Sequence, residues 1–127
     1  MGAKVILLAD RGFADTKLMR YCSETLGWGW IIRSKKNFWI YRPGKRSAKI
    51  ENLQLRRGQA RYFHGIAITD QKYGPVHLAM SKPLGSKESW YLLSSDPTTQ
   101  ETFAQYRLRF DIEERIMRNS RKQLLNP

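Results

Sequence analysis

The sequence holds few of the side chains that bind transition metals or form covalent crosslinks. It has one cysteine, Cys22, and two histidines, His64 and His77. A single cysteine forms no intrachain disulfide, and without a second cysteine or a histidine cluster there is no sequence pattern for a zinc site. We therefore expect a reducing compartment, the cytoplasm, and structural roles for both histidines, which fall within strand-like segments.

Long hydrophobic runs are missing as well, and acidic residues are scarce. The apolar run at 5–9 ends at Asp10 and is far too short for a membrane span or a signal peptide. The 23 lysines and arginines outnumber the 11 aspartates and glutamates, which gives a formal net charge of +12. This excess favours a polyanionic partner, with nucleic acid ahead of an acidic membrane surface. The 127 residues are enough for one hydrophobic core.

The start of the chain predicts a strand followed by a helix. Residues 4–9 (KVILLA) are apolar without alternation, which predicts a strand in the middle of a sheet, buried on both faces. A helical pattern begins at Ala14 or Asp15 and ends before Gly27, which stands in the position of a C-terminal cap. Asp10 then follows the strand directly, with Gly12 allowing a sharp turn and Phe13 packing it down.

Further strands are predicted where β-branched and aromatic residues lie between turn signals, at 28–33, 38–42, 61–69, 76–80 and 89–94. The first two complete a strand-helix-strand unit with an appended strand, and a basic turn joins them. The last three predict an antiparallel meander. Between these groups, residues 43–61 are basic and poor in apolar side chains, which indicates a loop-rich segment. The chain is therefore expected to be α/β.

The last quarter of the sequence predicts its longest helix. Asp96 and Pro97 are typical of an N-cap and a first helical position, and residues 98–122 contain no glycine or proline. Tyr106, Arg109 and Glu113 follow one another at steps of three and four, so they project from one helix face. Two interpretations of Glu113 stay open: an ion pair with Arg109, or a metal-binding carboxylate at the floor of a cleft.

Asp10 raises the same question at the other end of the chain. A lone Asp after a strand is commonly a turn former, but the end of a strand is also a rigid place to hold a metal ligand. Two carboxylates in a strongly basic chain suit a site where divalent cations activate a nucleophile at a phosphodiester. Mg²⁺, with Mn²⁺ as a substitute, prefers such oxygen ligands, with water and substrate completing its shell.

Two segments, ILLADRGFADTKL and YRLRFDIEE, resemble the insertion-sequence transposases of the DDE class that carry a Tyr-Arg-Glu-Lys signature. The family pattern is Tyr, two residues, Arg, three residues, Glu, six residues, Lys. Tyr106, Arg109 and Glu113 match this spacing, and Ser120 stands at the Lys position with Lys122 as the nearest substitute. Asp10, followed by Arg, Gly and an aromatic residue, matches the second acid of the family's catalytic triad.

The resemblance implies a single transposase catalytic domain over residues 1–127: part of an RNase H-like core, interrupted by a β-rich insertion at about 43–95. It implies DNA strand cleavage and transfer in transposition, with Asp10 and Glu113 as catalytic and Mg²⁺-binding acids. The family's first Asp lies on an earlier strand, and only nine residues precede Asp10. We therefore expect a truncated domain, associated with the bacterial nucleoid, that is inactive alone and pairs with a full-length transposase or a missing N-terminal portion.

The predicted DNA contacts come from the signature and from the basic segment. Ten lysines and arginines from Arg33 to Arg61 are opposed by one acid, Glu51, and such bases bind the phosphate backbone without reading sequence. The residues assigned to DNA are Tyr106, Arg109, Lys122, Arg11, Arg33, Lys35, Lys36, Arg56 and Arg57. Two roles stay open for Trp39, Trp90 and Tyr91, which either pack in the core or stack on unpaired bases.

Two other functions are compatible with the same residues. The first is a non-catalytic DNA-binding remnant that regulates a full-length transposase. The second is a small autonomous Mg²⁺ nuclease whose third ligand is an acid outside the pair. DNA binding that survives substitution of the acids favours the first, whereas an essential further acid favours the second.

Overall fold

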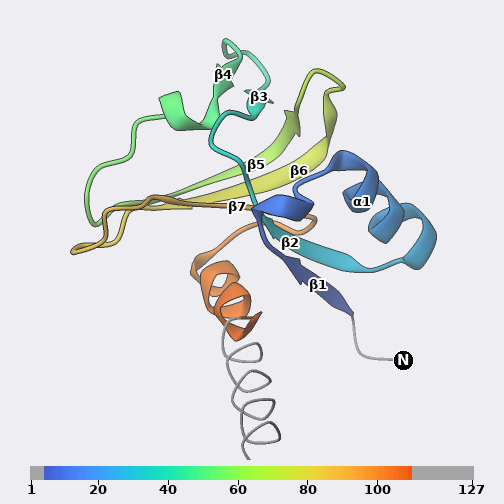
Figure 1. The fold of residues 1–127 in the computed structure, drawn as a ribbon. Coiled ribbons are helices and arrows are strands. Elements are labelled where there is room, and N and C mark those ends of the chain that lie inside the picture. Colours follow the sequence, from blue (N-terminus) through green and yellow to red (C-terminus); the bar gives the residue numbers. More distant parts are fainter. Residues whose placement is uncertain (1–4, 110–127) are drawn as a thin grey trace, which may run out of the picture.

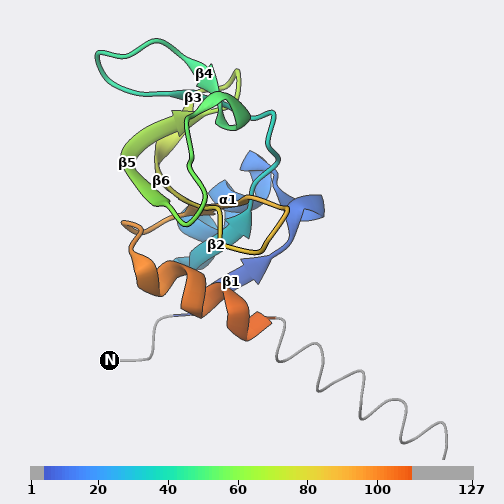
Figure 2. The same ribbon diagram turned by 90° about the vertical axis from the view of Figure 1, so that its left-hand side faces the viewer.

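The structure is a computed structural model that describes residues 5–109 (Figures 1 and 2). The predicted site residues Glu113 and Lys122 lie outside this range. A helix occupies residues 100–109 at the end of the described chain. The other elements are β1 Ile6–Ala9, η1 Arg11–Phe13, α1 Thr16–Arg20, η2 Tyr21–Leu26, β2 Gly29–Arg33, β3 Trp39–Tyr41, β4 Ala48–Lys49, η3 Ile50–Asn52, β5 Ala60–Ile68, β6 Tyr73–Ser81 and β7 Trp90–Ser94.

The strands form one seven-stranded sheet in the order β1-β2-β7-β6-β5-β3-β4. β1 and β2 are parallel neighbours joined through α1, which confirms the predicted strand-helix-strand unit. β5, β6 and β7 form the predicted antiparallel meander, and β7 also pairs with β2. The meander is thus continuous with the α/β unit in a single mixed sheet, so the fold is α/β as expected.

The predicted position of the first strand is wrong for the described sheet. β1 lies at one end of the strand order, and no described strand pairs with its outer edge. Its run of apolar residues has another cause, which is that both of its faces are covered. Leu7 and Ala9 belong to one hydrophobic cluster, whereas Ile6 and Leu8 pack against a second. Cover on both faces removes the polar alternation even from an edge strand.

The first helix begins and ends where the sequence predicts. The Asp15 side chain accepts a hydrogen bond from the backbone N–H of Lys17, which is an N-cap interaction. Gly27 ends the helix in the left-handed conformation at φ 65°, which glycine adopts without a Cβ penalty. Between these caps the chain changes from the α-helix Thr16–Arg20 to the π-helical turn Tyr21–Leu26. Met19 and Cys22 point into the core.

The basic middle segment contains more structure than its composition predicts. β3 does not pair with β2; it pairs with β5 at the far end of the sheet and with the short strand β4. Ile50, just after β4, is fully buried in the main cluster. Ile50, the partly buried Leu53 and Leu55, and the pairing of β4 thus attach this segment to the sheet, although its other residues are mostly polar.

The last helix begins later than predicted, at Gln100 rather than after Asp96 and Pro97. Thr99 supplies the cap, because its hydroxyl accepts a hydrogen bond from the Glu101 N–H at 3.1 Å. The Thr102 hydroxyl accepts a hydrogen bond from the Thr99 N–H at 3.0 Å, so the N-cap residue is held from both sides, as in a capping box. The buried hydroxyl of Thr98 donates to the Leu78 carbonyl and holds the chain extended for these extra residues.

Two hydrophobic clusters lie on opposite faces of the sheet. The larger one includes Met19, Trp30 and Ile32 on the α1 side. The smaller one joins Ile31 and Leu92 to the helix at 100–109, and Figure 1 shows that helix and α1 on opposite sides of β1 and β2. The 100–109 helix therefore lies against the sheet face onto which Tyr106 projects. Among the described residues, no helix is long and apolar enough to cross a membrane.

The two histidines stabilise the β5–β6 hairpin. Their rings contact edge to face, with centroids 5.4 Å apart. His64 Nε2 lies 2.9 Å from the Thr98 carbonyl oxygen, and His77 Nδ1 accepts a hydrogen bond from the Gly65 N–H. The pKa of His77 is lowered by burial and by His64, while Asp96 opposes this effect. The contacts are of the structural kind predicted for both residues.

Stability is expected to fall between pH 7 and pH 5 through His77. Because its folded-state pKa lies below the unfolded value of about 6.5, its contribution is complete above that pH and is lost as the folded-state group protonates. Protonation also removes the acceptor for Gly65. Urea unfolding of wild type and His77→Asn across this range measures the effect. Asparagine retains an acceptor without titrating, so an equal pH dependence in both proteins excludes His77 as its source.

Candidate functional site

Asp10 stands at the C-terminal end of β1 and is fixed by its own turn. Its Oδ1 accepts a hydrogen bond from the Gly12 N–H at 2.9 Å. A Cβ at Gly12 would lie 3.2 Å from this oxygen, so glycine permits the close approach. Phe13 does not pack the turn down as expected, since it is 57% exposed, and Ala14 is the buried residue instead. Asp10 is therefore a turn former whose carboxylate remains half exposed.

Two residues of the 100–109 helix converge on the same strand end. The buried hydroxyl of Tyr106 donates a hydrogen bond to the Ala9 carbonyl at 3.0 Å. An Arg109 guanidinium nitrogen lies 3.2 Å from Asp10 Oδ2 in an ion pair. The Asp10 side chain is 46% exposed and that of Arg109 15%. Residues nearly one hundred positions apart thus form one cluster around the Asp10 carboxylate.

The environment of Tyr106 favours its neutral form. Burial is the main cause, and it raises the pKa of the phenol, while Arg109 and Arg33 act in the opposite direction. The side chain is only 1% exposed. Tyr106 is therefore a structural hydrogen-bond donor in this arrangement, and its hydroxyl is buried.

Arg33 reaches this cluster from the neighbouring strand. Ala9 is in register with Ile32 across the parallel pair β1–β2, so Asp10 and Arg33 follow at the same level of the sheet. A hollow of about 230 Å³ is lined by three predicted DNA-binding residues together with four other side chains: Arg11, Arg33, Lys36, Ser34, Glu88, Ser89 and Tyr91. The fold thus collects three bases beside Asp10 from η1, β2 and the loop after β2.

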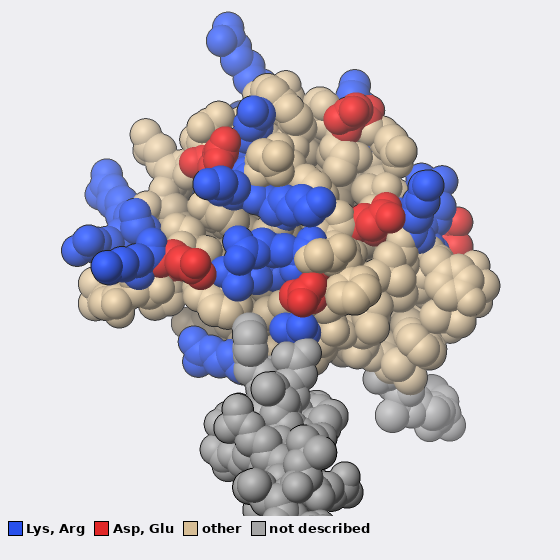
Figure 3. All heavy atoms as spheres, viewed as in Figure 1, with Lys and Arg blue, Asp and Glu red and all other residues tan. Residues whose placement is uncertain are grey.

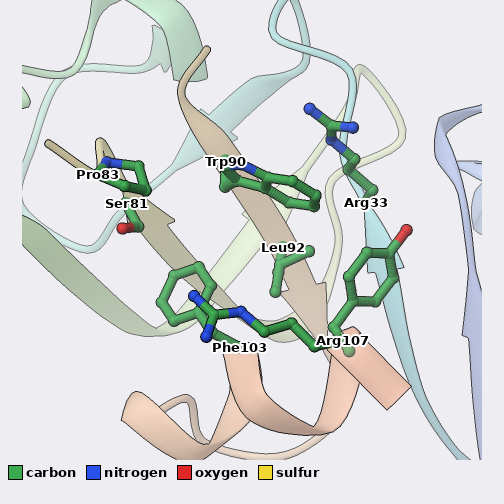
Figure 4. A pocket seen from close by; sticks show the side chains of 8 residues that line it. Arg33, Ser81, Pro83, Trp90, Leu92, Phe103 and Arg107 are labelled. Carbon is green, nitrogen blue, oxygen red and sulfur yellow. The ribbon is translucent and has the colours of Figure 1, made fainter. Parts of the chain in front are cut away.

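Arg33 also borders a second, more apolar hollow of about 370 Å³. Its guanidinium carbon lies 4.1 Å from the centroid of the Trp90 ring. Figure 4 shows the rings of Trp90 and Phe103 facing this hollow, with Arg33 at one end and Pro83 at the other. Arg33 is therefore shared between a basic hollow and an aromatic one.

Three other predicted DNA-binding bases do not line the hollow that contains Arg11, Arg33 and Lys36. Lys35 lines a different hollow, with Asp15 and Asp70. Arg56 and Arg57 lie in the turn before β5, which continues the β5–β6 ladder through the bond from the Gly58 N–H to the Lys82 carbonyl. Figure 3 shows basic side chains gathered across the middle and at one edge of the face seen in Figure 1, with acidic side chains beside and between these groups.

The sequence allows two roles for three aromatic residues, which are packing in the core and stacking on unpaired bases. Trp39 is 40% exposed and lies under the Lys49 ammonium group, 5.8 Å from the ring centroid. Tyr91 is partly buried against the main cluster, and Trp90 packs on Tyr106 with ring centroids 6.2 Å apart. Tyr91 and Trp90 therefore have packing roles, although Trp90 also walls the larger hollow.

Sequence reasoning missed Glu88 and Arg107. Glu88 pairs with Arg33 at 3.2 Å, and Arg107 lines the aromatic hollow. Glu88 lies 55 positions from its partner, and nothing in the local pattern around either residue links them. Arg107 directly follows Tyr106 in the sequence, but the helical spacing does not indicate which strand the Arg107 side chain faces.

The Asp10 carboxylate fits one ligand position of a divalent-metal site. It supplies the hard oxygen atoms that Mg²⁺ prefers, on a rigid strand end that remains accessible. Within residues 5–109, no three histidine, cysteine, aspartate or glutamate side chains gather closely enough to hold a metal ion. The described residues alone therefore do not supply a set of three such ligands around Asp10.

Comparison with known families identifies the family to which the chain belongs. The family model described as "Transposase DDE domain" matches residues 3–121 of the chain. No curated protein and no solved structure gives a significant match. The match spans both Asp10 and the segment from Tyr106 to Glu113, which the resemblance singled out at opposite ends of the sequence. The chain belongs to the family of transposases with a DDE domain, and its role is in DNA transposition.

Proposed function

We propose that this chain binds DNA at the end of β1 and contributes Asp10 and Glu113 to strand cleavage and transfer. The observation that carries this proposal is the convergence of Tyr106 and Arg109 on the Asp10 strand end. It brings a carboxylate, a guanidinium and a buried phenol together from the two segments that resemble the Tyr-Arg-Glu-Lys signature. Such a rigid arrangement is what a reaction at phosphorus needs to hold its groups in place.

Asp10 and Glu113 would be two of three acids that hold Mg²⁺ or Mn²⁺. When bound, the metal would activate the attacking oxygen and stabilise the leaving oxygen of the phosphodiester. Asp10 meets the requirements for one ligand, because its carboxylate is half exposed and anchored by Gly12 and Arg109. The resemblance places the third acid on an earlier strand, and no acid of the chain matches it.

DNA is held by the bases around this cluster. The proposed contacts are Arg11, Arg33 and Lys36 in the basic hollow, with Lys35, Arg56 and Arg57 along the flanking surface. Arginine suits this role because its planar fork matches two phosphate oxygens. Arg109 is assigned first to Asp10, and Lys122 remains a proposed contact from outside the described residues.

The fold of the chain is consistent with part of an RNase H-like core. Parallel β1 and β2 with the intervening α1 supply the α/β unit, and the 100–109 helix covers the opposite face. We infer that residues of about 43–95 are the β-rich insertion between the second acid and the glutamate. In support, the strands of this range, β4–β7, all extend the sheet on the side of β2 away from β1.

The 127-residue chain is expected to bind DNA without cutting it. With two acids of three, metal coordination is incomplete, and the barrier for hydrolysis stays high. The test is a nicking assay on supercoiled plasmid with Mg²⁺ or Mn²⁺, next to a binding assay at the same salt concentration. Asp10→Ala and Glu113→Ala serve as controls for contaminating nuclease, which would cut equally in all three samples.

Cleavage that is lost in both variants would contradict this expectation and would favour the autonomous nuclease with an unidentified third ligand. DNA binding that persists in both variants, without cleavage, would be compatible with two functions, a catalytic portion of a transposase and a regulatory remnant. Two additions separate them. Cleavage that appears when the missing N-terminal portion is added, and that depends on Asp10, supports a catalytic portion. Inhibition of a complete transposase of the same element, independent of Asp10, supports a regulatory remnant.

A further inference from the structure

Arg33 is the most constrained base in the hollow beside Asp10. Its side chain is 13% exposed. The Trp90 ring lies against its guanidinium at 4.1 Å, an attraction between the cation and the π electrons that holds the group in place. It therefore cannot turn away into solvent as the exposed bases Arg11 and Lys36 can. A ligand that enters this hollow meets Arg33 in a fixed position.

Arg33 already has an anionic partner. Glu88 Oε2 lies 3.2 Å from an Arg33 guanidinium nitrogen, and Glu88 lines the same hollow. The loop between β6 and β7 fixes the backbone at Glu88, because the Ser86 hydroxyl accepts from the Glu88 N–H and donates to its carbonyl. The Glu88 side chain is nevertheless 67% exposed. It can leave Arg33 and enter solvent without any change in the core.

We propose that Glu88 occupies a phosphate subsite formed by Arg11, Arg33 and Lys36, and that a phosphate of the DNA strand displaces it. A carboxylate and a phosphate present similar pairs of oxygen atoms to a guanidinium fork, so each excludes the other at Arg33. This inference rests on the proposed DNA binding and adds an internal competitor to it. A lone small anion does not readily displace Glu88, whereas a strand whose phosphates also meet Arg11 and Lys36 does.

The expected result is that Glu88→Gln binds DNA more tightly than wild type. Exposed ion pairs are weak, so the gain is about threefold in Kd for a labelled duplex of arbitrary sequence. Both proteins neutralise the same DNA phosphates, so the slope of log K against log salt should be similar in the two, and the difference should appear in Kd at each salt concentration.

Glu24→Gln is the matched control, because it makes the same change of net charge at an exposed position on η2. A double-mutant cycle with Arg33→Gln completes the test, since loss of Arg33 should cancel the gain from Glu88→Gln. Equal gains in the Glu88 and Glu24 variants, with wild type binding DNA, overturn the competitor role alone. A wild-type chain and variants that all fail to bind DNA overturn the proposed function and this inference together.

Discussion

The double charge reversal Arg11→Glu, Lys36→Glu is expected to lower the affinity for duplex DNA by about two orders of magnitude. Both side chains are exposed, and both line the hollow that also contains Arg33. Each reversal removes one phosphate contact and adds a repulsive charge. The slope of log K against log salt should fall by about two units, one for each lost contact. Fluorescence anisotropy at several salt concentrations measures the affinity and the slope together.

Net charge alone would also weaken binding, so the comparison needs a variant with the same charge. Arg20→Glu, Lys72→Glu supplies it, because Arg20 lies on α1, Lys72 lies in the turn before β6, and neither lines the hollow. Their contacts are with the rings of Tyr73 and Tyr41. Equal losses in both double variants would mean that DNA is attracted by overall charge and that the hollow beside Asp10 is no specific contact.

Local sequence patterns predicted the elements better than their neighbours in the sheet. The Asp15 cap, the Gly27 terminus and the three meander strands follow from side-chain preferences within a few residues. The edge position of β1 and the pairing of β3 with β5 depend on contacts between distant segments. No local pattern contains that information. An apolar run indicates that both faces of a strand are covered and leaves the number of its neighbours open.

At the candidate site too, the sequence predicted local placement but not the contacts between distant segments. Helical spacing placed Tyr106 and Arg109 on one face, and the resemblance linked that face to Asp10. The structure adds that Arg109 pairs directly with Asp10 and that Tyr106 is buried. The resemblance assigns Tyr106 to a DNA phosphate, whereas its hydroxyl bonds to the Ala9 carbonyl. Burial depends on which surface the helix covers, and spacing along the helix does not determine that surface.

Tyr106→Ala is expected to lower the free energy of unfolding by about 3–5 kcal/mol, the loss typical of a buried aromatic side chain. The residue is 1% exposed and packs against Trp90 between the helix and the sheet. Tyr106→Phe keeps the ring and removes only the hydroxyl, which leaves the Ala9 carbonyl without this donor. That change should cost about 1–2 kcal/mol. Urea denaturation followed by circular dichroism measures both losses.

Leu108→Ala is the control on the same helix, since Leu108 is 54% exposed and its truncation should change stability by less than about 0.5 kcal/mol. The phenylalanine variant also separates the two roles of the hydroxyl. If the hydroxyl holds the strand end that carries Asp10, Tyr106→Phe loses stability and keeps the affinity for DNA. Unchanged stability, with weaker DNA binding, would instead place the hydroxyl on a phosphate. The helix would then have to shift on binding to free it from Ala9.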